Sequence, residues 1–141
     1  MSIRFVLLPL FVEVALTLGL LLWLAVLRRN DLMSGAVRPA QIALRERHWL
    51  QRTQQVGNSF SNQFETPVLF YVLTILEIVT RHADIVFVVL AWIFVVSRLG
   101  HAFIHTTSNR VMQRGGVYAV GVLVLIVMWA IFIIRILAGL A

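Results

Sequence analysis

Four stretches of the chain are long and apolar enough to cross a lipid bilayer, and they constrain its fold more than any other feature. They cover residues 5–27, 61–80, 85–104 and 117–138. A bilayer-spanning helix needs about 20 mainly apolar residues, so each stretch predicts one span. The sequence therefore predicts an all-α fold. We expect a single membrane domain over residues 1–141, an integral membrane four-helix bundle with a loop over 28–58 between its first two spans.

The first stretch has features of a signal peptide, but we interpret it as a retained span. It is long, it contains Glu13, and it ends at Arg28 and Arg29 without the small residues of a cleavage site. The composition agrees, because 60% of the residues are hydrophobic and the mean hydropathy is +0.92, far from soluble usage. The chain has no cysteine, which excludes disulfides, thiolate metal sites and a cysteine nucleophile.

The arginines predict the orientation of the spans. The first loop carries Arg28, Arg29, Arg38, Arg45, Arg47 and Arg52, the loop before the fourth span carries Arg110 and Arg114, and the other side carries Arg4, Arg81 and Arg135. By the positive-inside rule, both arginine-rich loops lie in the cytoplasm and both termini lie outside. The arginines sit between apolar segments rather than along one soluble face, so we expect no nucleic-acid partner.

Polar residues open the second span at its predicted cytoplasmic end. Asn58, Asn62 and Glu65 follow one another at spacings of four and three residues, which places them on one face of a continuous helix. Pro67 lies two residues after Glu65 and removes one backbone hydrogen bond. We expect this proline to bend the helix entrance, and either to open a pocket beside Glu65 or to shape packing alone.

A second polar face ends the third span. Arg98, His101 and His105 are separated by three and four residues and again share one helix face. The connection over residues 81–84 is so short that the second and third spans must be antiparallel neighbours, which brings both polar faces to a similar depth. A charge alone in a bilayer costs about 2.5 to 3.5 kcal/mol, so we expect Glu65 and Arg98 to pair with each other or with a polar ligand.

The same residues also have plainer interpretations. Glu65 and Arg98 could form a structural pair that joins two helices. His101 and His105 could ligate a metal, but no further histidine or cysteine lies in a span to complete the shell, so we expect no metal site. We expect Glu13 to be a buried partner of an arginine or a hydroxyl rather than a proton carrier.

Two further segments receive structural interpretations. The fourth span contains no polar residue before Arg135 other than Tyr118 and Trp129, so we expect it to be scaffold. The stretch over residues 39–56 has helical composition with Pro39 at a plausible first turn, and we expect a helix there that could extend the second span into the cytoplasm.

Together these features resemble one protein family. Four spans, external termini, a long basic first loop, the second-span stretch "NQFETPVLFY" and the third-span stretch "SRLGHAFIHTTSNR" are similar to the MAPEG family, the membrane-associated proteins in eicosanoid and glutathione metabolism. The resemblance is best to bacterial members and covers most of the chain. It implies a homotrimer in a bacterial inner membrane, with both termini periplasmic and a glutathione site between neighbouring subunits at the cytoplasmic face.

The resemblance also implies roles for the two polar faces. Asn62 and Glu65 would bind glutathione, with Glu65 at its α-amino group. Arg98, His101 and His105 would contact its carboxylates or its backbone. Two carboxylates and one ammonium group in the ligand suit several arginines and one glutamate.

Four arginines outside these faces complete the expected site. Arg28 or Arg29, at the end of the first span, would supply charge from a neighbouring subunit. Family enzymes stabilise the glutathione thiolate with an arginine near the start of the fourth span. For that role this chain offers Arg110 and Arg114.

The chain departs from the family pattern at three places. Family enzymes carry an arginine where this chain has Asn58, and two tyrosines where it has His101 and His105. The thiolate-binding arginine of those enzymes aligns nearer Met112. These departures affect the catalytic residues more than the scaffold.

Two functions therefore stay open at this point. The first is a membrane glutathione-dependent transferase or peroxidase, which acts on a lipophilic small molecule that arrives from the bilayer. The second is a non-catalytic protein of the same fold, which binds lipid or serves as an accessory subunit of a larger membrane complex. The altered arginine positions favour the second function.

Overall fold

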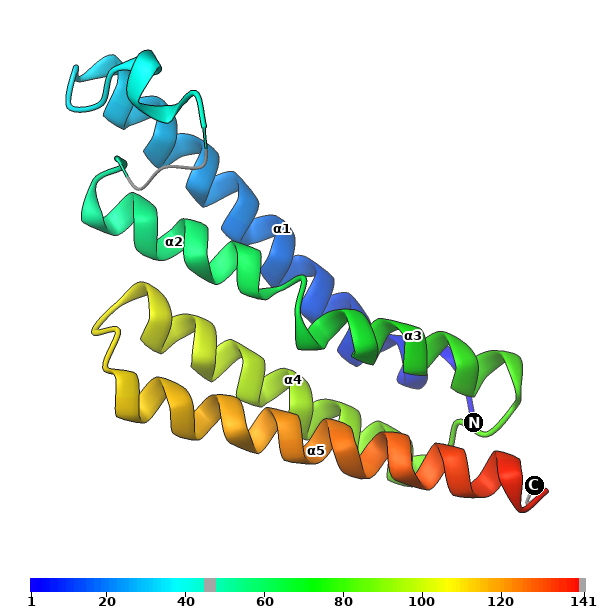
Figure 1. Ribbon diagram of the computed structural model, residues 1–141. Coiled ribbons are helices and arrows are strands. Elements are labelled where there is room, and N and C mark those ends of the chain that lie inside the picture. The colour runs from blue at the N-terminus through cyan, green and yellow to red at the C-terminus, as the bar shows by residue number, and fades with distance from the viewer. Residues whose placement is uncertain (45–47, 140–141) are drawn as a thin grey trace.

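The structure is a computed structural model that describes residues 1–44 and 48–139, and within those ranges it is helical with no strand (Figure 1). The elements are α1 (Ile3–Met33), the short 3-10 helix η1 (Pro39–Ile42), α2 (Gln51–Asn62), α3 (Thr66–Val79), α4 (Ile85–Thr106) and α5 (Val111–Leu137). The predicted all-α membrane fold is confirmed. Two of the arginines used for the predicted orientation, Arg45 and Arg47, lie outside the described residues.

Three of these helices carry the membrane character of the chain. α1, α4 and α5 are each long and apolar enough to cross a bilayer, with mean hydropathies between 2.1 and 2.9 over their most apolar windows. Most of their outward-facing side chains are large and apolar, which suits contact with hydrocarbon rather than water. The chain is therefore a multi-pass integral membrane protein. Its orientation in the membrane stays a prediction.

The predicted second span is two helices with a break between them. α2 ends at Asn62, and α3 begins at Thr66. Pro67 explains the break, because proline has no N–H to donate to the carbonyl of Gln63, four residues earlier, and its ring clashes with that carbonyl. Glu65 precedes the first residue of α3 with backbone angles of φ −96° and ψ −108°. The prediction that it continues the helix face of Asn58 and Asn62 is therefore wrong.

The long helices pack around two apolar clusters. In the larger cluster, Phe70 of α3 stacks on Phe94 of α4 with ring centroids 4.9 Å apart, and α1 and α5 add side chains around them. The smaller cluster joins α1, α2 and α4 through Leu20, Val56 and Ala102. Figure 1 shows α4 and α5 side by side, α1 running along α2 and α3, and both termini at the same end.

A close approach of α4 and α5 depends on one glycine. A Cβ atom on Gly121 would lie 2.7 Å from Oγ of Ser97, so only glycine allows this helix separation. Tyr118 lies one turn before Gly121 and is thereby brought against α4. This contact matters for the site described below.

The described residues of the first loop contain less helix than its composition predicts. Within 39–44 and 48–50, helical structure is limited to the 3-10 turn Pro39–Ile42, and the regular helix begins at Gln51. The backbone N–H of Leu50 donates to Oδ2 of Asp31 at 3.3 Å, which ties the start of α2 to the end of α1. The predicted helix over residues 39–56 is thus limited to its final turns, which do run on into the helix that ends at Asn62.

Candidate functional site

The break between α2 and α3 places two of the predicted residues in contact. Asn62 is the last residue of α2, and Glu65 stands just before α3. The backbone N–H of Glu65 donates to the carbonyl oxygen of Asn62 at 3.2 Å, which folds the chain into a tight turn. Nδ2 of Asn62 then donates to Oε2 of Glu65. The amide and the carboxylate are therefore linked through the turn rather than along one helix face.

Arg98 lies behind this turn and is nearly inaccessible, with 2% of its surface exposed. Its Nη2 donates to Oδ1 of Asn62 and lies 3.5 Å from the Asn62 carbonyl oxygen. Its Nε and Nη1 have no hydrogen-bond partner among the described residues. A buried donor without a partner costs about 1 to 3 kcal/mol, and more when charged, so these atoms favour a ligand that accepts from them.

The expected pair of Glu65 and Arg98 is indirect. No oxygen of Glu65 lies within salt-bridge distance of Arg98 in the part of the chain that the structure describes. Asn62 stands between them, since its oxygen accepts from Arg98 and its nitrogen donates to Glu65. An amide has both a donor and an acceptor and can therefore link a cation to an anion without either charge being neutralised by direct contact.

Two histidines on α4 extend the polar surface beyond Arg98. The rings of His101 and His105 are buried with centroids 5.3 Å apart. Nδ1 of each ring has no hydrogen-bond partner among the described residues. Tyr118 of α5 lies against them, 5.5 Å from His101, and the guanidinium carbon of Arg98 is 5.9 Å from the centre of the Tyr118 ring.

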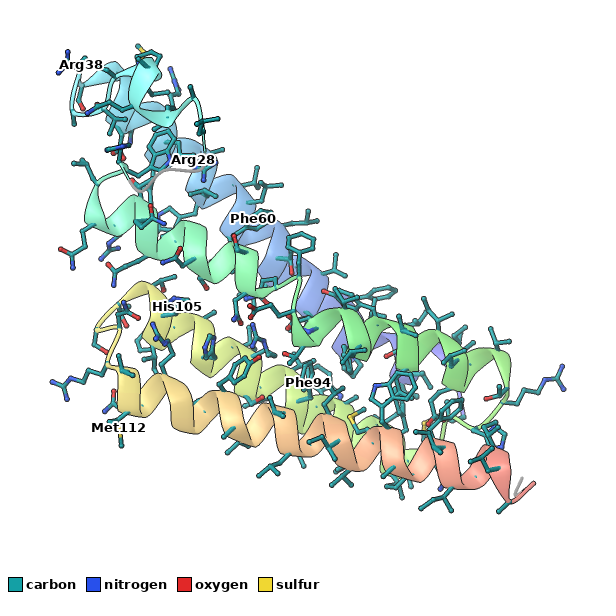
Figure 2. All side chains as sticks on the ribbon, in the orientation of Figure 1. Arg28, Arg38, Phe60, Phe94, His105 and Met112 are labelled. Carbon is teal, nitrogen blue, oxygen red and sulfur yellow. The ribbon has the colours of Figure 1, made fainter. Side chains whose placement is uncertain are left out.

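Apart from Arg98, which is buried behind them, these side chains line one cavity of about 540 Å³. Its wall comes from α2, the turn, α4 and the start of α5. The lining residues are Asn58, Ser61, Asn62, Glu65, His101, His105, Arg114, Gly115 and Tyr118. Figure 2 shows His105 on the side of α4 that faces α2. The volume lies within the range of about 300 to 1,000 Å³ that is usual for small-molecule sites.

The family comparison bears on this chain as a whole. The model of the MAPEG family matches residues 6–134. The chain belongs to the MAPEG family. Comparison with curated proteins and with solved structures finds no match. The matched region contains every residue that lines the cavity, and membership of the family supports a glutathione-related function in the membrane.

The structure separates the two arginines expected to bind a thiolate in this MAPEG protein. Arg114 is half-buried and lines the cavity, and its Nη1 donates to Oδ1 of Asn109 at 2.6 Å. Arg110 is exposed, precedes α5 and does not line the cavity. Met112, which aligns with the family's arginine, is 88% exposed and points away from the bundle in Figure 2.

The two arginines at the end of α1 also differ from each other. Arg28 lines a second cavity, between α1, the first loop and α2, and its guanidinium lies 5.0 Å from the centre of the Trp49 ring. Both side chains are exposed, but Arg29 lines neither cavity. Within one subunit, neither arginine reaches the residues around Asn62.

Sequence reasoning missed three residues that line the cavity, Ser61, Gly115 and Tyr118. Tyr118 was assigned to scaffold, yet it lines the cavity and lies against His101 and Arg98. A signal was present, because Tyr118 is the one phenol in the fourth apolar stretch. What the sequence did not give was the close approach at Gly121 that brings α5 against α4.

Glu13 of α1 lies on the inner side of Arg98. It has no exposed surface, and neither carboxylate oxygen has a hydrogen-bond partner among the described residues. It interacts electrostatically with Arg98 and with Tyr71. Arg98 is therefore close both to Asn62 and to a buried carboxyl group of α1.

Proposed function

We propose that this MAPEG protein is a membrane glutathione-dependent transferase or peroxidase that acts on lipophilic electrophiles. The observation that carries the proposal is the cavity itself. Its lining contains one carboxylate, Glu65, and one accessible cation, Arg114. Behind this lining lies Arg98, a buried arginine with two unpaired donors. A site built in this way is complementary to a small zwitterion with more negative than positive groups.

Glutathione has that charge pattern, with two carboxylates, one ammonium group and a thiol. Glu65 would accept from the ammonium group. Arg98 would donate through Nε or Nη1 to a carboxylate, and the Nδ1 atoms of His101 and His105 would pair with the peptide backbone. Asn58, on the rim of the same cavity, supplies an amide where related enzymes have a cation.

Arg114 is the residue that we assign to the thiol. A guanidinium beside a thiol favours the thiolate, which is the nucleophilic form. In conjugation, the sulfur forms a bond to the electrophilic carbon, a halide or other leaving group departs with its electron pair, and the thiol proton goes to solvent. Reduction of a lipid hydroperoxide would consume two glutathione molecules and yield an alcohol, water and glutathione disulfide.

The proposal includes a homotrimer with the cavity at the cytoplasmic face and the termini in the periplasm. In that assembly a neighbouring subunit could bring Arg29 to the cavity, since this arginine is exposed at the end of α1. Arg28 is less suited to that role, because it already stacks on Trp49 of its own subunit. Crosslinking in the membrane followed by mass determination tests the trimer.

A non-catalytic accessory protein is the second candidate. The exposed position of Met112 and the absence of Arg110 from the cavity favour it, because only Arg114 is left to stabilise a thiolate. Under this alternative the cavity would bind glutathione or another zwitterion without turnover, or would serve assembly with a partner. Gentle solubilisation should then recover partner proteins in fixed stoichiometry.

Two measurements test the proposal. Purified protein in detergent should be stabilised against heat by millimolar glutathione, because a ligand at about 100 times its dissociation constant stabilises by about 2.7 kcal/mol. No shift at any glutathione concentration up to the millimolar range overturns the proposal.

Conjugation of glutathione to an aryl halide then separates an enzyme from a binder. Wild type should turn over, and Arg114→Ala should lose most of this rate. Arg110→Ala, the same change on the residue that directly precedes α5, should lose less. Binding without turnover in wild type would favour the accessory protein.

A further inference from the structure

The second cavity is larger than the first and has a different chemical character. Its volume is about 770 Å³, and it lies between the last turns of α1, the first loop and α2. The residues that line it are Leu21, Leu24, Arg28, Ile42, Ala43, Leu44, Trp49, Thr53, Gln54, Gly57, Asn58, Phe60 and Ser61. Figure 2 shows Arg28 and Phe60 on this side of the bundle, away from His105.

The lining divides into an apolar part and a polar part. Leu21, Leu24 and Phe60 form an apolar wall toward the membrane-spanning part of α1. Gln54 and Thr53 form a polar part toward the loop. Arg28 is the one charged residue among the described residues that line the cavity. Its occupant should therefore combine an aliphatic body with a negative charge.

Arg28 is held in a way that leaves its donors available. The face of its guanidinium lies over the Trp49 ring at 5.0 Å, a cation–π arrangement that fixes the side chain. Stacking uses the face of the group and leaves the N–H bonds in its plane, where they can donate to two oxygens of one anion. Gly57 lies beside it, and a Cβ there would be in ordinary van der Waals contact with Nη2 of Arg28, at 3.8 Å.

The surroundings place this cation where lipid head groups are found. Arg28 directly follows the apolar part of α1, and Trp23 lies about one turn before it. Arg52 of α2 lies 5.6 Å from the centre of the Trp23 ring. Tryptophan and arginine are enriched together at the membrane–water interface, where the ring is apolar at one end and the cation meets anionic lipid.

We propose that this cavity is a binding site for an anionic amphiphile, a molecule with a negatively charged head and an aliphatic tail. The head accepts hydrogen bonds from Arg28, and the tail lies along Leu21, Leu24 and Phe60. A fatty-acid carboxylate and the phosphate of an anionic phospholipid both supply this chemistry. The site shares only Asn58 and Ser61 with the cavity around Asn62, so binding here does not require glutathione.

The test uses nitroxide-labelled probes and protein in nanodiscs of phosphatidylcholine. The probes are palmitate, phosphatidylglycerol and phosphatidylcholine, and electron paramagnetic resonance measures the motionally restricted fraction of each. Wild type should bind at least one anionic probe about tenfold more tightly than the neutral one, the difference expected for a charge-assisted contact. Selection of palmitate identifies a free amphiphile, and selection of phosphatidylglycerol identifies a bilayer lipid.

Variants distinguish the cavity from general surface charge. Arg28→Gln should reduce the preference to about equal binding, whereas Arg29→Gln, the same change on the neighbour that does not line the cavity, should retain it. Gly57→Leu leaves the charge unchanged and places a side chain between Leu24 and Arg28, so it should also remove the preference. Equal binding of all three probes in wild type, or equal losses in Arg28→Gln and Arg29→Gln, overturns the proposal.

A glutathione thermal shift on the same wild-type sample keeps this result separate from the proposed function. Amphiphile selection without a glutathione shift leaves the second cavity standing and removes the glutathione site. A glutathione shift without amphiphile selection supports the glutathione site and overturns the amphiphile site in the second cavity.

Discussion

The two ends of the helix bundle both contain an arginine and acidic residues, but the arginine has different hydrogen-bond and ion-pair partners at each end. At the end with the termini, Nη2 of Arg135 lies 2.7 Å from Oδ2 of Asp84, and Nη1 donates to the carbonyl oxygen of His82 at 3.3 Å. At the other end, Arg98 is bonded only to Asn62, and two of its nitrogens have no partner among the described residues.

The difference in pairing corresponds to a difference in task. Asp84 also accepts from the backbone N–H of Phe87 at 3.0 Å, so it caps α4 and holds the end of α5 to the turn between α3 and α4. Arg135 and Asp84 each already have a counter-charge there, which is typical of a structural contact. Arg98 is more deeply buried and less completely bonded, which is typical of a group that waits for a ligand.

The largest expected effect comes from removing the two arginines in turn. Arg98→Ala should weaken glutathione binding by at least about 100-fold, because it removes two charge-assisted donors of about 1.5 to 3 kcal/mol each. Arg135→Ala should lower thermal stability and leave the glutathione dissociation constant unchanged. Calorimetric titration of both folded variants makes the comparison, and an equal loss of affinity in both would show that the two ends are not distinct.

The acidic residues give the next effect. Glu65→Gln should weaken glutathione binding about tenfold, since the ammonium group loses a charged acceptor, with little change in unfolding temperature. Asp84→Asn should do the opposite and destabilise the protein by less than about 1 kcal/mol, because the exposed ion pair is lost while asparagine can still cap α4. Thermal unfolding and glutathione titration of both variants are needed. A stability loss confined to Glu65→Gln would contradict the assignment.

The sequence was sufficient to predict which residues lie close together, but not the contacts that they make with one another. Apolar length and the positions of arginine were sufficient for an all-α membrane protein, and the predicted residues Asn62, Glu65 and His101 do line one cavity. Periodicity could not locate the helix break, because a proline near a helix start can either bend the helix or end it. The direct ion pair of Glu65 with Arg98 was expected because a continuous helix was assumed. In such a helix the Glu65 carboxylate would lie on the same face as Asn58 and Asn62.

Tertiary packing accounts for what sequence reasoning missed. The place of Tyr118 in the cavity depends on how closely α5 approaches α4, and that distance is set by Gly121 against Ser97. The separation of Arg114 from Arg110 likewise depends on where α5 begins. Neither feature leaves a periodic pattern in a single chain.

Two buried carboxylates allow a finer comparison of the ends. Glu13 interacts electrostatically with Arg98, and Glu77 with Arg135. Glu13→Gln should weaken glutathione binding a few-fold, because the carboxyl group that helps to position Arg98 is lost, while Glu77→Gln should leave binding unchanged. Both substitutions keep the shape of the side chain, so a measured difference reports charge. Equal affinities in wild type and in Glu13→Gln would show that Asn62 alone is sufficient to position Arg98.

The smallest expected effect is the loss of stability at low pH that comes from the Asp84–Arg135 ion pair. Burial by itself would raise the pKa of Asp84, but the hydrogen bonds from Arg135 and from the Phe87 backbone outweigh it and hold the pKa below its ordinary value of 3.8. A carboxyl whose pKa is lowered by folding adds stability above the pKa of the unfolded chain, and loses it as pH falls through the folded value. Because the side chain of Asp84 is 38% exposed, solvent screening limits this contribution to less than about 1 kcal/mol. Unfolding temperatures measured from pH 6 down to pH 3 should therefore fall slightly more steeply in wild type than in Asp84→Asn below about pH 4, and parallel curves would place the stability of this end in its apolar contacts instead.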